Sequence, residues 1–189
     1  FSHFNPVFFT KIVVDTKITT GFTSGQYITG LESGAFGVIE NSNNGQYSLT
    51  TSNLLYVRTL SGTFVSGESI VDESGNSLRI AKENTISHFI VVNRGSSYPS
   101  DNVTISVNGT KIDKSAVLTY VDTATTGLGQ VYKIDFANRN LFNTEYLYPP
   151  SVSVTYASAT QPSTFGSGAI VVPVLFRNTV VTYNQQDVK

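Results

Sequence analysis

The sequence predicts an all-β protein, built as tandem small antiparallel modules of the β-sandwich or β-barrel kind, with no substantial helix. Three observations carry this prediction: short runs of alternating apolar and polar residues, Gly- and Asn-rich turns between them, and a strand-turn cassette that occurs twice. Successive side chains of a strand point to opposite faces, so such alternation buries one side. No segment shows a sustained 3.6-residue period bounded by helix caps.

The repeated cassette occupies the first half of the chain. One copy runs from Ser24 to Ile39 and the other from Ser66 to Ile80. Both copies open with Ser-Gly, contain a Glu-Ser-Gly turn and close on an apolar segment. Each copy therefore predicts a strand, a turn and a second strand, and repeats of this kind build extended β scaffolds.

A longer repeat occupies the second half. In each copy an Asn-Arg turn follows a strand, and a Tyr-Pro step (Tyr98-Pro99 or Tyr148-Pro149) leads to the strand 103–107 or 152–156. Proline fixes its own φ, holds the preceding residue extended and lacks an N–H, so it suits the start of a strand. Two unrelated edge strands are the alternative interpretation. Asn108-Gly109 between alternating runs also predicts a hairpin.

We expect two modules. Residues 1–85 contain the two Ser-Gly cassettes, and residues 86–189 contain the two Tyr-Pro strand repeats. The chain begins with Phe1 and contains no methionine, so we expect it to be part of a longer polypeptide. It contains no cysteine either, which excludes disulfides and thiolate metal sites.

Composition argues against two classes of partner. Twelve basic and 13 acidic residues give a net charge of -1, so the chain lacks the basic footprint of a nucleic-acid-binding protein. No run approaches the roughly 18 to 20 apolar residues that a membrane helix requires. We therefore expect no nucleic-acid partner and no membrane insertion.

Both repeats resemble those of structural proteins of tailed bacteriophages, especially cyanobacterial phages with contractile tails. Phe64–Ile70 and Glu32–Ile39 are similar to their Gly-rich cassettes, which combine a Gly-Glu-x-Ile strand with Ser-Gly-Ala-x-Gly-x-Val. Val91–Pro99 resembles their Val-Thr-Asn-x-Gly-Ser-Gly-Tyr-Pro pattern, with Ser97 in place of the second glycine. The later copy keeps only Tyr148-Pro149-Pro150.

The resemblance implies a structural component of a phage virion and does not specify which part. We expect the tail, the baseplate or a fibre attachment rather than the capsid. Such a module acts by assembly with other virion proteins and with further copies of itself. Two alternatives stay open: a carbohydrate- or receptor-binding module that contacts a host-surface glycan, and a capsid decoration protein. The resemblance carries over no catalytic residue and no cofactor, and we expect no enzymatic activity.

The titratable residues suggest no catalytic site. The histidines are His3 and His88, too few for a three-histidine metal site. His88 has the same alternating phase as Ile86 and Ile90, so we expect a partly buried structural role. Glu32 and Glu73 occupy equivalent places in the two cassettes, and residues in equivalent places of a repeat more often serve the same turn than form a catalytic pair.

The segment that begins at Asp72 partly matches a calcium-binding loop. Acidic or polar residues occupy its first, third, fifth and twelfth positions, the last of which is Glu83. The sixth position, which should be glycine, is Ser77, and strand-like segments flank the loop in place of helices. A solvated β-turn is the interpretation that this context favours, and we assign no metal site.

One aromatic group is a candidate contact site. Phe142, Tyr146 and Tyr148 lie close together in an Asn-rich, loop-like stretch. Aromatic rings beside amides stack on sugars and are favoured at protein interfaces. We therefore predict that these three residues contact either a ligand or a partner protein, with burial in the core as the alternative.

Overall fold

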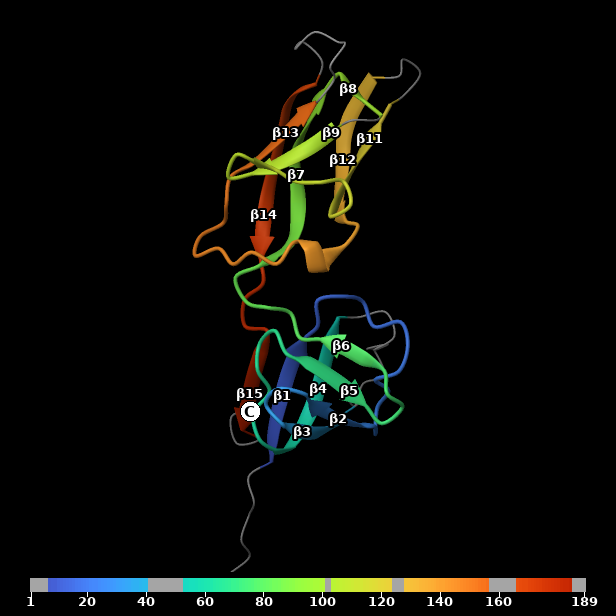
Figure 1. Cartoon of the computed structure of the whole chain (residues 1–189), viewed down its shortest axis with the longest axis vertical. Helices are drawn as coiled ribbons and strands as arrows, with labels where there is room; N and C mark the ends of the chain where they lie inside the picture. Colours follow the sequence, from blue (N-terminus) through green and yellow to red (C-terminus); the bar gives the residue numbers. More distant parts are fainter. Residues whose placement is uncertain (1–6, 41–52, 101–102, 124–127, 157–165, 185–189) are drawn as a thin grey trace, which may run out of the picture. The chain divides into compact units, whose positions relative to one another are not determined.

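The structure, a computed structural model, describes residues 7–40, 53–100, 103–123, 128–156 and 166–184 (Figure 1). The described part is all-β with antiparallel pairing, so the predicted fold class is confirmed. A single-turn 3-10 helix, η1 (Arg139–Leu141), is the only helical segment among these residues.

The chain divides into two compact units, which we call unit 1 (residues 1–83 and 177–189) and unit 2 (residues 84–176). The sequence predicts a second module that extends to residue 189, but residues 177–189 belong to unit 1. Its strand β15 (Val180–Asn184) pairs antiparallel with β1 (Phe8–Val13). Turn signals identify hairpins but do not specify how distant strands pair, so the sequence alone missed this return.

Unit 1 is built on one curled sheet of seven strands, in the order β15-β1-β4-β3-β2-β5-β6. The strands not yet given are β2 (Tyr27–Gly30), β3 (Phe36–Ile39), β4 (Leu54–Ser61), β5 (Ser69–Asp72) and β6 (Ser77–Arg79). Alternate residues of these strands point inward. Fully buried core residues include Ile12, Ile18, Phe22, Ile28, Ile39, Leu55, Ile70 and Ile80.

The two cassettes of unit 1 are the hairpins β2–β3 and β5–β6, as the repeat predicted. The hairpins join through β2 and β5, with Thr29 opposite Val71. On either side, Ile28 faces Asp72 and Gly30 faces Ile70. Because Ile28 is equivalent to Ile70 and Gly30 to Asp72, a local twofold axis through the Thr29–Val71 pair relates the two cassettes.

Unit 2 contains three small sheets, in the orders β10-β9-β13, β11-β12-β8 and β14-β7. Their strands are β7 (Ile86–Ser96), β8 (Tyr98–Pro99), β9 (Val103–Val107), β10 (Thr110–Lys111), β11 (Val117–Asp122), β12 (Leu128–Phe136), β13 (Val152–Tyr156) and β14 (Ser167–Leu175). A separate apolar core lies between them. Its buried residues include Ile86, Phe89, Tyr98, Ile105, Val117, Val131, Ile134 and Val171.

The strands of unit 2 pair as an interlocked repeat. The first copy supplies β7, β9 and β11, and the second supplies β12, β13 and β14. The middle strands, β9 and β13, pair around Ile105 and Val154, while β7 pairs with β14 and β12 with β11. The outer pairs carry a bulge at the same place, after Val174 in β14 and after Tyr120 in β11. Each copy therefore completes the sheet of the other.

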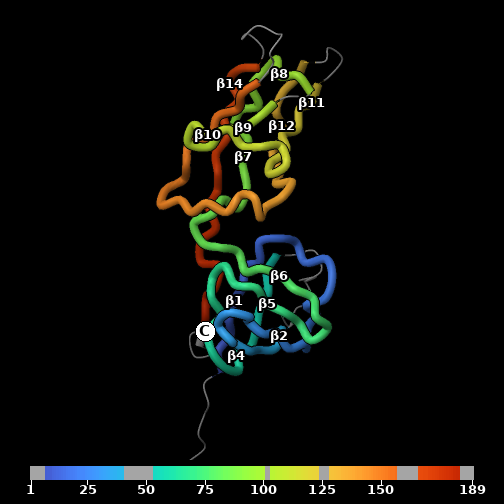
Figure 2. Tube along the Cα trace, in the orientation of Figure 1, coloured from blue at the N-terminus to red at the C-terminus, as the bar shows by residue number. Residues whose placement is uncertain are grey.

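The predicted Asn-Gly hairpin is confirmed between β9 and β10 (Figure 2). Thr110 pairs with Val107, so only Asn108 and Gly109 form the turn. Their φ angles are +47° and +80°, the left-handed values that this two-residue turn requires and that Asn and Gly adopt most readily.

Candidate functional site

The carboxylate of Glu68 is buried in unit 1, where its side chain is fully inaccessible to solvent. Oε1 accepts the N–H of Val65 at 2.6 Å, and Oε2 accepts the N–H groups of Glu32 and Ser33 at 3.3 and 3.0 Å. The Ser33 hydroxyl, 2.9 Å from both oxygens, donates to the same group. A Cβ on Gly30 would lie 2.6 Å from Oε2, so only glycine leaves room for this carboxylate.

A second buried carboxylate, that of Asp72, lies at the first position of the segment that partly matches a calcium-binding loop. Its oxygens accept the N–H groups of Phe22, Ser74 and Asn76 at 3.0, 2.9 and 2.8 Å, and the Asn76 amide at 2.9 Å. Burial raises the pKa of Asp72, but these hydrogen bonds outweigh it and hold the pKa below its usual 3.8. N–H donors point at the oxygens where a cation would have to bind. Within the described segments, no group of three or more His, Cys, Asp or Glu could hold a metal.

Glu32 and Glu73, the glutamates of the two Glu-Ser-Gly turns, do not form a shared carboxylate site, and the local twofold axis relates Glu73 to Leu31 rather than to Glu32. Glu73 accepts the N–H of Tyr27 through Oε2 at 3.2 Å, which ties the second cassette's turn to the first cassette. Glu32 contributes its backbone N–H to Glu68. Each glutamate therefore lies at a turn contact, and each contact is different.

His88 is exposed, which corrects the partly buried position expected from alternation. Ile86 and Phe89 are buried, but Ile90 is 46% exposed. The β-bulge between β7 and β14 shifts the phase of the strand after Ile86, because an extra residue reverses which side chains face the core. His3 lies outside the described residues.

The predicted aromatic group separates into three environments. Phe142 is 6% exposed and lies in the core, with ring centroids 5.6 Å from Phe136 and 6.4 Å from Phe89. Tyr146 is half-buried against the same core, and burial raises the pKa of its hydroxyl. Tyr148 is 76% exposed. Of the three, Tyr148 is thus the residue whose ring is placed to contact a ligand or partner.

Unit 2 also exposes an aliphatic strip on the two-stranded β7–β14 sheet. It consists of Ile90, Val92, Ile170 and Val172, which are 42 to 64% exposed. Ile90 and Val172 are direct cross-strand partners and therefore share a face. Ile170 lies two residues from Val172 along β14 and therefore on the same face. Val92 is the extra residue at the register shift next to Val91 and is itself 64% exposed.

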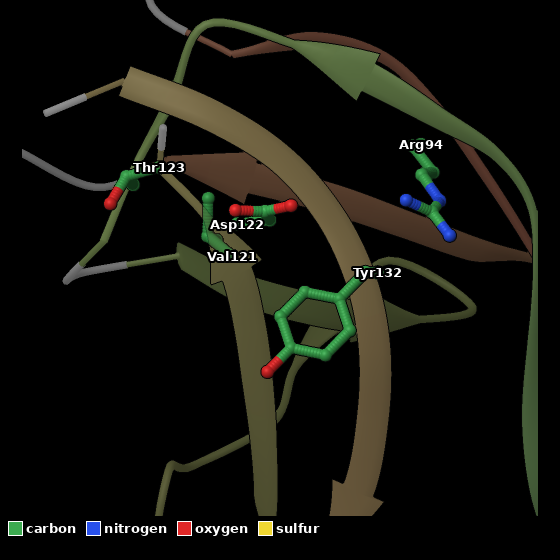
Figure 3. Close-up of a pocket in the computed structure, with 5 residues that line it drawn as sticks. All are labelled: Arg94, Val121, Asp122, Thr123 and Tyr132. Atoms are coloured by element: carbon green, nitrogen blue, oxygen red, sulfur yellow. The ribbon is translucent and has the colours of Figure 1, made fainter. Parts of the chain in front are cut away.

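A polar pocket of about 410 Å³ opens on unit 2, lined by Arg94, Val121, Asp122, Thr123 and Tyr132. Arg94 comes from β7, Tyr132 from β12, and the other residues from β11 and its end. Figure 3 shows the Asp122 carboxylate and the Arg94 guanidinium facing each other across the pocket, with the Tyr132 ring at its edge. The Asn-Arg turn predicted at Arg94 is wrong for this copy of the repeat, because β7 continues as a strand through Arg94 to Ser96. The pocket itself was not predicted, because its residues come from strands that are distant in the sequence.

Comparisons with protein families, curated protein sequences and solved structures found no match to this chain. Among the described residues, no helix is long and apolar enough to span a membrane. The functional interpretation therefore depends on the sequence repeats and on the surfaces described above.

Proposed function

We propose that the chain is a non-enzymatic structural module of a tailed-phage virion, in the tail, baseplate or a fibre attachment, and that it acts through protein–protein assembly. The aliphatic strip of unit 2 is the observation that carries this proposal. Contiguous exposed apolar surface, when it is large enough, marks sites that bind other proteins. Burial of the strip in the particle removes this apolar surface from water.

The geometry of Ser97 supports the resemblance on which the virion assignment rests. Its φ is +62°, a left-handed value that glycine adopts without strain and that serine rarely adopts. The phage pattern has its second glycine at this position. The Asn93 side chain accepts the N–H of Gly95 at 2.9 Å and braces the same turn, so the motif has a conformational reason in this chain.

The proposal is tested first in the native source. Particles are separated on a density gradient, and mass spectrometry searches the fractions for peptides of this chain. Co-migration with large particles in stoichiometric amount is the expected result. Recovery as a small free protein contradicts the proposal.

A variant pair then tests the aliphatic strip. Val92→Lys together with Ile170→Lys introduces two charges on the strip, and we expect the particles to lose most of the protein. Leu60→Lys, at a side chain of unit 1 that is 48% exposed, is the matched control and should leave incorporation unchanged. If the parent chain, the double lysine variant and Leu60→Lys are incorporated equally, the strip is not an assembly surface.

A carbohydrate- or receptor-binding module is the second candidate, supported by the exposed ring of Tyr148. Tyr148→Ala should abolish glycan binding if this ring is the contact, whereas Tyr146→Ala also removes core packing and is interpretable only if the fold is retained. Binding that is unchanged by Tyr148→Ala would end this version of the adhesin hypothesis. A capsid decoration role is distinguished by the location of the protein in the particle.

A further inference from the structure

The interlocked repeat gives unit 2 two equivalent arginines with different environments. Val91 in β7 occupies the same register position as Phe136 in β12, so Arg94 is the equivalent of Arg139. Each arginine lies three residues after the matched position, Val91 or Phe136, and directly follows an asparagine.

Arg139 has a structural role. Its guanidinium donates to the carbonyl oxygens of Ile86 and Ser87 at 2.9 and 2.6 Å, and it lies 4.1 Å from the centroid of the Phe136 ring. Two directed hydrogen bonds and a cation–π contact hold the side chain in place. Arg139 therefore ties the turn after β12 to the start of β7.

Arg94 lacks the equivalent contacts. Arg139 donates to the carbonyl of Ser87, and the residue equivalent to Ser87 is Tyr132, so matching contacts would join Arg94 to the Tyr132 carbonyl. Instead, the Arg94 side chain is exposed in the polar pocket beside Tyr132. Within the described ranges, no hydrogen bond or ion pair joins its guanidinium to another residue. The reason is local: β7 continues to Ser96 as a strand, whereas the chain after Phe136 turns into η1. Among the described residues, the guanidinium of the repeated arginine thus has hydrogen-bond partners in one copy and none in the other.

The pocket places opposite charges on facing walls. Asp122 and Arg94 do not form an ion pair, so each can bond to a molecule between them (Figure 3). A simple anion would be repelled by Asp122, and a simple cation by Arg94. A neutral polyol satisfies both groups, because its hydroxyls donate to the carboxylate and accept from the guanidinium.

The remaining lining residues fit the same ligand chemistry. The Tyr132 ring, 47% exposed, offers an apolar face for the C–H groups of a sugar ring. The Thr123 hydroxyl can either donate or accept. A volume of about 410 Å³ is in the lower part of the range for small-molecule sites and suits one or two sugar rings.

We propose that this polar pocket is a saccharide-binding site, in which Arg94 and Asp122 bond to hydroxyls and Tyr132 contacts the ring face. This inference goes beyond the assembly role and depends on unit 2 alone. Loss of the site leaves virion incorporation unchanged, so the two proposals fail separately. It also differs from the adhesin hypothesis centred on Tyr148, because it names a different surface.

The test uses the whole chain on an array of neutral and acidic oligosaccharides, followed by NMR titration with the best-bound sugar. Arg94→Gln and Asp122→Asn should each weaken binding by about tenfold or more, since each removes a charge-assisted hydrogen bond. Tyr132→Ala should abolish binding, while Tyr132→Phe retains the ring and should retain most of the affinity. These side chains are exposed, and circular dichroism verifies that every variant is folded.

Two control variants separate this pocket from other surfaces. Lys111→Gln removes an exposed charge of the same unit, and Tyr148→Ala removes its most exposed tyrosine; both should bind as the parent chain does. Inorganic phosphate and glycine are titrated as probes for an anion or zwitterion site. The proposal is overturned if no array sugar binds, if phosphate or glycine binds instead, or if Tyr148→Ala weakens binding as much as Arg94→Gln.

Discussion

Replacement of Glu68 by glutamine tests how strongly a buried carboxylate stabilises unit 1. The change keeps the shape of the side chain but converts one acceptor oxygen into an NH₂ group. If that NH₂ lies at the Oε1 position it faces the Val65 N–H, and at the Oε2 position it faces those of Glu32 and Ser33. In either orientation at least one buried backbone donor loses its acceptor.

The magnitude follows from these contacts. An unsatisfied buried donor costs about 1–3 kcal/mol, and hydrogen bonds to a neutral acceptor are each roughly 1 kcal/mol weaker than those to a charged one. Burial of a neutral amide in place of a charge recovers part of this loss. We expect Glu68→Gln to lower the free energy of unfolding of unit 1 by about 2–4 kcal/mol.

The local twofold axis provides a matched control. Gln26 is the equivalent of Glu68, and its Oε1 accepts the N–H of Thr23 at 2.8 Å, as Glu68 accepts that of Val65. Its Nε2 makes only a long contact, 3.4 Å, with the Ser74 hydroxyl. Gln26→Glu keeps the Thr23 hydrogen bond at a less buried position, so we expect a change below about 1 kcal/mol.

The assay is urea unfolding monitored by hydrogen exchange and mass spectrometry, which follows peptides of the two units separately. With an m-value of roughly 1–2 kcal/mol/M, the unit 1 midpoint should fall by at least about 1 M in Glu68→Gln, while unit 2 peptides keep their midpoint. A shift below about 0.5 M, or an equal shift caused by Gln26→Glu, would refute the assignment of the stability to this carboxylate.

Three further changes have defined outcomes. Ser97→Gly removes the strain of a left-handed serine and should raise the free energy of unfolding of unit 2 by up to about 1 kcal/mol, measured as a higher melting temperature. A lower melting temperature would show that Ser97 is not strained. Asp72 has a lowered pKa when folded, so its contribution is complete above the unfolded pKa and is lost as pH falls through the folded pKa. Asp72→Asn should therefore flatten the acid side of the stability–pH curve of unit 1, and an unchanged slope there would contradict this role. Arg139→Gln removes the donors to the Ile86 and Ser87 carbonyls and should destabilise unit 2 by about 2–3 kcal/mol in thermal unfolding, whereas a loss below 0.5 kcal/mol would show that these contacts are not stabilising.

Local patterns in the sequence predicted local structure well. The predicted strands over residues 103–107 and 152–156 and the turn at Asn108-Gly109 are confirmed, because both signals depend on neighbours along the chain. The position of His88 was wrong because a bulge, which has no clear sequence signal, shifted the strand's phase.

The site was less predictable because its geometry is non-local. Phe142 and Tyr148 are six residues apart in the same polar stretch, yet one is in the core and the other is exposed. Aromatic content alone cannot separate them, since both fates suit a large ring. The polar pocket combines Asp122 of β11 and Tyr132 of β12, two strands that pair, with Arg94 of β7, and only the order of the strands brings these residues together.

The interlocked pairing also explains why one copy of the repeat is free to change. When each copy completes the sheet of the other, both copies must keep the same register and bulge, and this is observed on both sides. The register that the two copies share ends at Val91 and at Phe136, the last paired residue of β12, whereas β7 stays paired with β14 through Arg94 as far as Ser96. After β12 the chain turns and Arg139 binds the backbone of β7, whereas β7 continues and leaves Arg94 in the pocket. The shared register thus preserves the fold, while the difference beyond it supplies the residue that we assign to ligand binding.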